Sequence, residues 1–153
     1  MNKKGVTLIE LVVVFVIIGI MAALMIPAIG TSWLPRYRLR SATRDIVSTM
    51  RMAQLRVVST GRQAYQVNFL SGNSYVLQYQ TTLGAPWVTE GTTQTLPSGI
   101  TIATPGVAAK FQSNSTCPAG SITSLTINQM KGSTIQGSKT ILLNPATCRV
   151  TIE

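Results

Sequence analysis

The first 27 residues, MNKKGVTLIELVVVFVIIGIMAALMIP, constrain the fold of this chain more than any other stretch. From Val6 to Ile26, a run of 21 residues contains only two polar side chains, those of Thr7 and Glu10. A helix rises about 1.5 Å per residue, so the run predicts a helix that can cross a hydrocarbon core roughly 30 Å thick. A carboxylate in lipid costs on the order of 2–3 kcal/mol, so Glu10 should have a function and a partner.

Three interpretations of this stretch compete. A secretory signal peptide has basic residues, an apolar run of about 7–15 residues and a small-residue cleavage site, whereas this run is longer and an acid interrupts it. A plain membrane anchor accounts for the length and leaves Glu10 unexplained. In the third interpretation, a prepilin leader, Lys3 and Lys4 belong to a short segment that ends at Gly5.

Residues 5–10, GVTLIE, closely resemble the N-terminal signature of type IV pilins and type II secretion pseudopilins. The resemblance implies that a prepilin peptidase cuts after Gly5 and that the new N-terminus, Val6, is then methylated. Val6 departs from the family, which usually has Phe there. Glu10 becomes the fifth residue of the mature chain. Pro27 falls where the family usually has a helix-kinking proline.

A physical argument agrees with this resemblance. In lipid, Glu10 needs a counter-charge, and the freed amine of Val6 on a neighbouring subunit can supply it. Such a pair attracts strongly in a low-dielectric helix bundle, whereas one buried charge alone is penalised. We therefore expect Glu10 to act in assembly, with other pilin or pseudopilin subunits and membrane lipid as partners.

The charges around the apolar run bear on its orientation. Lys3, Lys4 and the N-terminal amine favour a cytoplasmic N-terminus, but Arg36, Arg38 and Arg40 follow the run closely on its other side. The prepilin resemblance decides between the two possible orientations, because it requires a leader in the cytoplasm. It implies a single-pass protein of the bacterial inner membrane with a periplasmic C-terminal domain, which becomes extracellular when it is part of a pilus.

The composition argues against an enzyme. The 153 residues contain no histidine and only four acidic side chains. This nearly removes hydrolytic triads, paired-carboxylate catalysis and histidine-based metal sites, so we expect no catalytic residue, no metal and no cofactor. The formal net charge is +9, and loss of Lys3 and Lys4 with the leader would leave +7. Such an excess favours contact with nucleic acid, acidic lipid or an acidic partner, or simply aids solubility.

Two cysteines, Cys117 and Cys148, lie outside any metal-ligand spacing. A periplasmic domain folds in an oxidising compartment, which favours a disulfide between them. It would close a loop of roughly 32 residues and stabilise the fold by roughly 3–4 kcal/mol. Two buried free thiols are the alternative.

Residues 36–61 predict an amphipathic helix, and the stretch from Pro27 to Pro35 before it is expected to be kinked or locally melted. Apolar residues recur at spacings of three and four along one stripe, and arginines cluster beside it. The arginine face has three possible interpretations. It is solvated or contacts lipid headgroups, it binds nucleic acid, or it packs against acidic groups of neighbouring subunits. Gly61 ends the pattern. The stripe consists of Leu39, Ala42, Ile46, Met50, Ala53 and Val57, and the arginines are Arg36, Arg40, Arg44 and Arg51.

From residue 62 the period of the pattern changes to two. Residues 65–69 and 75–79 alternate around a turn at 71–73, which predicts a hairpin with one buried face. Further short strands are expected at 87–89, 100–102, 107–112, 122–127, 139–143 and 149–153. The predicted fold class is α+β, with a long N-terminal helix packed on an antiparallel sheet. The predicted divisions are a leader (1–5), an assembly helix (6–27), an amphipathic helix region (28–61) and a β domain (62–153).

The rest of the chain resembles the FimT/GspH family, through residues 44–47, 51–54 and 60–62, the turn at 96–100, and the ending with its strand at 140–143. The resemblance implies a minor pilin of a type IV pilus or of its initiating tip complex. Its alternatives are a minor pseudopilin that serves protein export by type II secretion, and a DNA-binding minor pilin that serves DNA uptake.

Some of the family's DNA-uptake members carry a C-terminal GRxR-like motif that contacts DNA. The matching stretch here is 148–151, in which only Arg149 agrees, because Cys148 replaces the glycine and Thr151 the second arginine. Lys131 and Lys139 are expected near Arg149 at the same end of the sheet. These three cations are the candidate DNA-binding residues, and contact with DNA would be mainly through phosphates.

Overall fold

The computed structural model describes residues 7–29, 33–71, 73–114 and 116–153. Helix α1 runs from Leu8–Ile29 and helix α2 from Trp33–Ser59. The chain separates into two compact units, Met1–Pro35 and Arg36–Glu153. Among the described residues, no helix combines the length and the apolar character needed to cross a membrane.

Both prolines of the predicted junction lie inside helices. Pro27 is within α1, which continues to Ile29. Pro35 is the third residue of α2, where the first turn leaves backbone N–H groups without helical partners, so the missing donor of proline costs little there. Residues 30–32, the rest of the stretch expected to be kinked or melted, lie outside the described residues.

The predicted apolar stripe of α2 is confirmed, because all its members are buried beneath the strands. Thr43 and Val47 are buried as well, which widens the stripe. The hydroxyl of Thr43 donates a hydrogen bond to the carbonyl of Leu39 at 2.7 Å, so its burial leaves no polar atom unpaired. Gly61 follows the helix with φ of 68°, as expected of a residue that ends a helix. The stripe members are Leu39, Ala42, Ile46, Met50, Ala53 and Val57.

The first sheet is built on the predicted hairpin. Strands β1 (Ala64–Leu70) and β2 (Ser74–Gln80) pair antiparallel from Ala64↔Gln80 to Leu70↔Ser74. Strand β6 (Ala108–Gln112) pairs with the other side of β1. The short strands β3 (Val88–Thr89) and β4 (Gln94–Thr95) both pair with β2.

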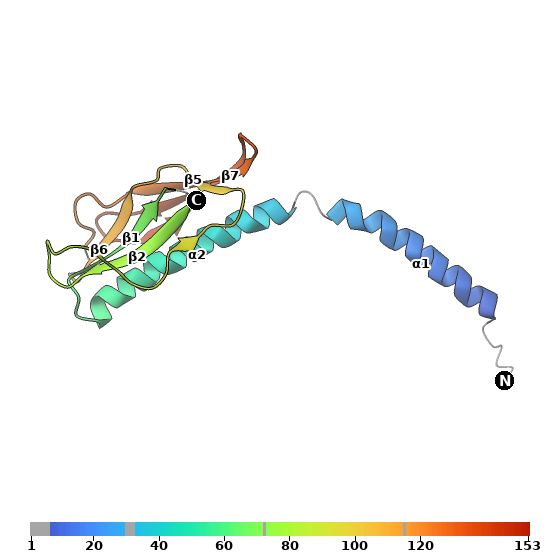
Figure 1. Cartoon of the computed structure of the whole chain (residues 1–153), viewed down its shortest axis with the longest axis horizontal. Coiled ribbons are helices and arrows are strands. Elements are labelled where there is room, and N and C mark those ends of the chain that lie inside the picture. Colours follow the sequence, from blue (N-terminus) through green and yellow to red (C-terminus); the bar gives the residue numbers. More distant parts are fainter. Residues whose placement is uncertain (1–6, 30–32, 72, 115) are drawn as a thin grey trace. The chain divides into compact units, whose positions relative to one another are not determined.

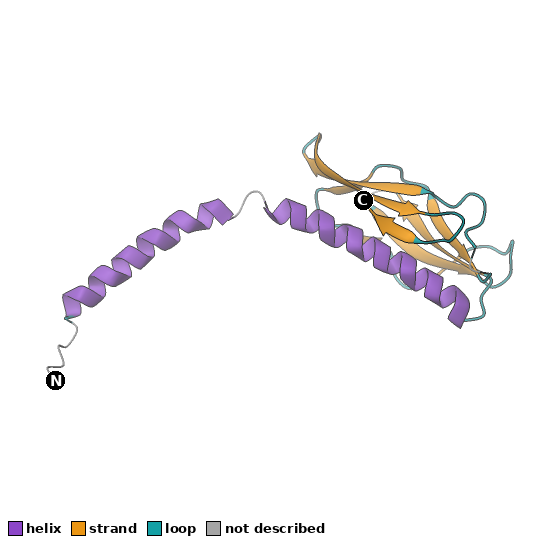
Figure 2. Ribbon diagram, turned by 180° about the vertical axis from the view of Figure 1, so that it is seen from behind, coloured by secondary structure: helices purple, strands orange, loops and turns teal. Residues whose placement is uncertain are grey.

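The second sheet has the order β5-β7-β8-β9. It consists of β5 (Ile100–Ile102), β7 (Ser124–Lys131), β8 (Thr134–Leu143) and β9 (Val150–Ile152). All its neighbours are antiparallel. In Figure 1 and Figure 2 the strands of both sheets lie on one side of α2. The α+β class with antiparallel strands is thus confirmed.

The strands differ from the expectation in four respects. They form two sheets rather than one. Strand β4 lies in a segment predicted to be loop, and β8 begins five residues earlier than expected. The hairpin is also covered on its predicted open face, where Gln66 and Val76 are buried. Gln66 satisfies its amide by donating a hydrogen bond to Gln78 Oε1 at 2.7 Å, which permits this burial.

Candidate functional sites

The N-terminal end of α1 carries Glu10 in a reciprocal contact with Thr7. The backbone N–H of Glu10 donates to Thr7 Oγ1 at 3.4 Å, and the N–H of Thr7 donates to Glu10 Oε2 at 3.4 Å. This is the pattern of a capping box, in which two N-terminal backbone donors are satisfied by side chains. Glu10 therefore has a local role in starting the helix. Gly5 and Val6, the predicted cleavage and methylation residues, lie outside the described residues.

The surface of α1 is almost entirely apolar and open. Residues 8–23 are all exposed, and no side chain in this range other than Glu10 is polar. Phe15, for example, is 64% exposed. An apolar surface of this extent is covered in a working protein by lipid or by other chains. The large apolar side chains are Leu8, Ile9, Leu11, Val12, Val13, Val14, Phe15, Val16, Ile17, Ile18, Ile20 and Met21.

The three candidate DNA-binding cations do not lie at one end of the sheet. Lys131 ends β7 opposite Thr134, at the turn before β8. Lys139 is five residues further along β8, about 16 Å at the rise of a strand. Arg149 accepts a hydrogen bond at its carbonyl from the N–H of Asn144, beyond the other end of β8. Lys131 and Arg149 are therefore separated by the length of β8.

Arg149 instead lies near an arginine of α2, Arg51. Arg149 and Arg51 line one hollow of about 410 Å³, together with Gln54, Leu55 and Val150. Arg51 also borders a second hollow of about 630 Å³ that includes Arg44 and Ile152. From the sequence, the helix arginines and Arg149 were expected to form separate basic regions. No local signal could have joined them, because roughly 100 residues separate α2 from β9.

The two cysteines form a disulfide between the loop after β6 and the turn before β9. Their Cα atoms are 5.5 Å apart. Cys148 has φ of 53°, a left-handed conformation that glycine adopts readily and other residues rarely adopt. Gln54 Nε2 donates a hydrogen bond to the Cys148 carbonyl. Cys148 thus adopts a backbone conformation that favours glycine, and the disulfide and the contact with Gln54 hold it there.

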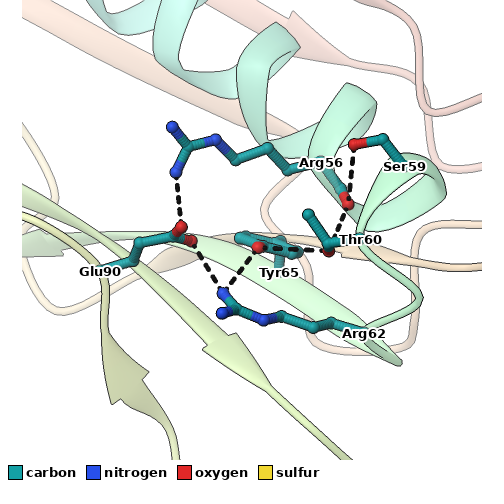
Figure 3. Close-up of polar contacts among 6 residues, drawn as sticks. All are labelled: Arg56, Ser59, Thr60, Arg62, Tyr65 and Glu90. Carbon is teal, nitrogen blue, oxygen red and sulfur yellow. Dashed lines mark hydrogen bonds and ion pairs between the residues drawn. The ribbon is translucent and has the colours of Figure 1, made fainter.

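A cluster of charges connects the end of α2 to the first sheet (Figure 3). Glu90 Oε1 lies 2.7 Å from Arg56 Nη1, and Glu90 Oε2 lies 3.2 Å from Arg62 Nη1. Arg62 Nη1 also donates a hydrogen bond to the hydroxyl of Tyr65 at 2.8 Å. Glu90, one of the four acids of the chain, is therefore occupied in holding α2, β1 and the loop after β3 together. It was not singled out in the sequence.

In the described part of the chain, no three acidic, cysteine or histidine side chains gather around a common point. Tyr75 is a buried titratable side chain of the domain. Burial is the main cause that raises the pKa of its hydroxyl above 10.0. The hydrogen bond with Thr49 lowers this pKa, whereas the negative charge of Asp45 raises it, and the net effect is an increase. Its position in the core indicates packing rather than catalysis.

Comparison with known proteins finds similarity at two levels. Residues 1–26 match the prokaryotic N-terminal methylation motif. The fold resembles the crystal structure of the type IV minor pilin FimU of Pseudomonas aeruginosa, with a TM-score of 0.53 and 18% sequence identity over 80% of this chain and 92% of that chain. A search of curated protein sequences gives no significant match. The chain thus joins a prepilin-type N-terminal motif to a pilin-like fold.

Proposed function

We propose that this protein is a minor pilin, a structural subunit of a type IV pilus or of the complex that initiates it. The observation that carries the proposal is the methylation motif at residues 1–26 in front of a pilin-like domain. A filament subunit needs a surface that neighbours can cover, and the exposed apolar side of α1 offers one. Membership of the FimT/GspH family is part of the proposal. A structural role also agrees with a chain that lacks histidine.

In this proposal a prepilin peptidase removes residues 1–5, and the amine of Val6 is methylated. The motif indicates anchoring to the membrane through the N-terminus. We extend this to a single pass through the bacterial inner membrane, with residues 6–27 in lipid before assembly and 62–153 in the periplasm. Analysis of the intact mass tests the processing step. It should show loss of five residues, Met1–Gly5, and gain of one methyl group, whereas a mature chain that still begins at Met1 contradicts it.

Glu10 has two candidate roles that one pair of variants separates. Glutamine can replace glutamate in a capping box, so Glu10→Gln keeps the cap and removes the charge. Glu10→Ala removes both. If Glu10 pairs with the Val6 amine of a neighbour, both variants should be processed normally and both should fail to enter filaments. Normal assembly of Glu10→Gln, with a defect only in Glu10→Ala, would reduce Glu10 to its capping role.

A minor pseudopilin of type II secretion is the alternative within the same structural class, since the same processing and fold serve it. The two assignments differ in the assembly that takes up the chain. Cross-linking of the processed protein to pilus subunits or to pseudopilins in intact cells discriminates between them. DNA uptake is not part of the proposal, because Arg149 alone matches the motif and Lys131 lies at the far end of β8.

A further inference from the structure

A groove runs between the outer side of α2 and strand β9. Two adjoining hollows form it, and Arg51 and Leu55 line both of them. Apolar side chains contribute to its lining, and Leu55, a large aliphatic residue, is 72% exposed there. Ile152 of β9, 44% exposed, forms the opposite wall. Arg44, Arg51 and Arg149 line it as well. We define this α2–β9 groove by Arg44, Val47, Arg51, Leu55, Arg149 and Ile152.

The wall formed by β9 is the edge of the second sheet. Among the described strands, β9 pairs with β8 alone. Glu153 and Thr140 exchange both backbone hydrogen bonds, and the N–H of Asn144 donates to the carbonyl of Arg149. In an antiparallel ladder the intervening residues alternate, so the N–H and C=O of Ile152, opposite Ile141, point away from β8. Ile152 therefore presents both backbone groups to an incoming strand.

We propose that the α2–β9 groove binds an extended, acidic segment of a different protein, which adds a strand beside β9. Main-chain hydrogen bonds to Ile152 would fix the direction of the bound segment, as in other cases of strand addition. An apolar side chain of the segment would cover Leu55, and its carboxylates would pair with the arginines of the groove. Arg44 and Arg51 are seven residues apart on the helix, about 10 Å. Because arginine side chains are long, the two guanidinium groups can reach two acidic side chains that lie two or four residues apart on one side of the bound strand.

The charge distribution argues against a second copy of this chain as the occupant. Its four acidic residues are Glu10, Asp45, Glu90 and Glu153, so no extended segment holds two of them. Glu90 is already paired with Arg56 and Arg62. The inference does not rest on the proposed function, because a partner outside a filament could supply the same segment.

The apolar side chains in the lining favour a peptide over nucleic acid. Phosphate contacts need cations and little else, and they gain nothing from an exposed leucine at the centre of the site. An unpaired strand edge likewise serves a polypeptide, since its N–H and C=O groups match another backbone. Leu55 and Ile152 therefore distinguish the two classes of partner, whereas Arg51 and Arg149 serve either.

The test is a fluorescence anisotropy titration of the full chain in uncharged detergent with a fluorescein-labelled peptide, TETVTET. Its two glutamates and its valine share one side of an extended chain. Peptides TKTVTKT and TETSTET control for charge and for the apolar contact. Arg51→Glu and Leu55→Ser should each weaken binding of TETVTET about tenfold or more. Arg36→Glu and Leu83→Ser change an exposed arginine and an exposed leucine outside the groove, and they should bind as the unaltered chain does.

Two further measurements complete the test. Hydrogen exchange of the Ile152 amide should slow when TETVTET is bound, because strand addition protects it. A labelled 20-base-pair DNA, titrated in parallel at low salt, probes the nucleic-acid alternative. Absence of TETVTET binding, equal binding of TKTVTKT, or unchanged exchange at Ile152 each overturns the proposal. DNA binding that Arg51→Glu abolishes and Leu55→Ser preserves, without peptide binding, assigns the groove to nucleic acid instead.

Discussion

The guanidinium carbon of Arg62 lies 3.5 Å from the centroid of the Tyr79 ring. The same group donates hydrogen bonds to Tyr65 and Glu90 from its Nη1 atom. Arg62 stands just before β1, whereas Tyr79 is in β2 and Glu90 follows β3. One partly buried cation therefore holds three segments of the first sheet to one another.

Arg62→Lys should lower the free energy of unfolding by about 1 kcal/mol. Lysine keeps the charge but loses the flat face that lies on Tyr79 and the geometry that reaches Tyr65 and Glu90 together. Urea unfolding of the full chain in uncharged detergent measures the change. Arg36→Lys is the matched control and should have no effect, because Arg36 is exposed. Equal stability of the two variants would show that the stacking contributes nothing.

Ile46→Ala should destabilise the domain by about 2–5 kcal/mol. Ile46 is 0% exposed in the buried stripe of α2, so its truncation leaves a cavity between the helix and the strands. Leu55→Ala on the same helix removes a side chain of the same size that is 72% exposed, and it should leave the midpoint of urea unfolding nearly unchanged. A similar loss from both variants would contradict the assignment of the buried face.

Tyr75 makes the stability depend on alkaline pH. Burial raises the pKa of its hydroxyl in the folded chain above the usual 10.0, so the unfolded chain releases this proton first. The contribution is complete below pH 10 and is lost as the pH rises toward the folded pKa. Tyr75→Phe should be less stable than the unaltered chain at pH 8, since it loses the bond with Thr49, and the difference should shrink by pH 11. Unfolding free energies at the two pH values measure it, and a constant difference refutes it.

The conformation of Cys148 predicts an unusual gain from glycine. With the disulfide absent, Cys117→Ser with Cys148→Gly should be more stable than Cys117→Ser with Cys148→Ser by about 1 kcal/mol, because φ of 53° strains a residue that has a Cβ. The unaltered oxidised chain should exceed both by roughly 2–5 kcal/mol. Thermal or urea unfolding of the three proteins ranks them. A serine variant that equals the glycine variant would show that this backbone relaxes without the disulfide.

Local pattern was sufficient for the elements whose partners are close in sequence. The spacing of Leu39, Ile46 and Met50 predicted which side of α2 is buried, since helical geometry places such residues together. The hairpin formed by β1 and β2 was predicted because its two strands alternate on either side of a short turn. The disulfide followed from having just two cysteines in a domain expected to be oxidised.

Long-range pairing determined what the sequence could not predict. Strand β4 holds only Gln94 and Thr95, and pairing with β2 rather than any propensity makes it a strand. The division into two sheets depends on which strand β7 joins, and this has no local signature. For the candidate sites, the sequence identified Arg149 and Arg51 without indicating that they line one hollow. Lys131 was expected near Arg149, but the length of β8 separates them.

The burial of α2 has a consequence for how the chain matures. The side chain of Leu39 lies against Gly137, where a Cβ would come within 3.7 Å of Leu39 Cδ2. The core around the helix also includes Ile141 and Val150. During synthesis, therefore, the helix emerges first while the strands that shield it emerge last. Until those strands are made, the apolar side of α2 is exposed to solvent, and exposed apolar surface of this kind is what chaperones and proteases recognise in a nascent chain.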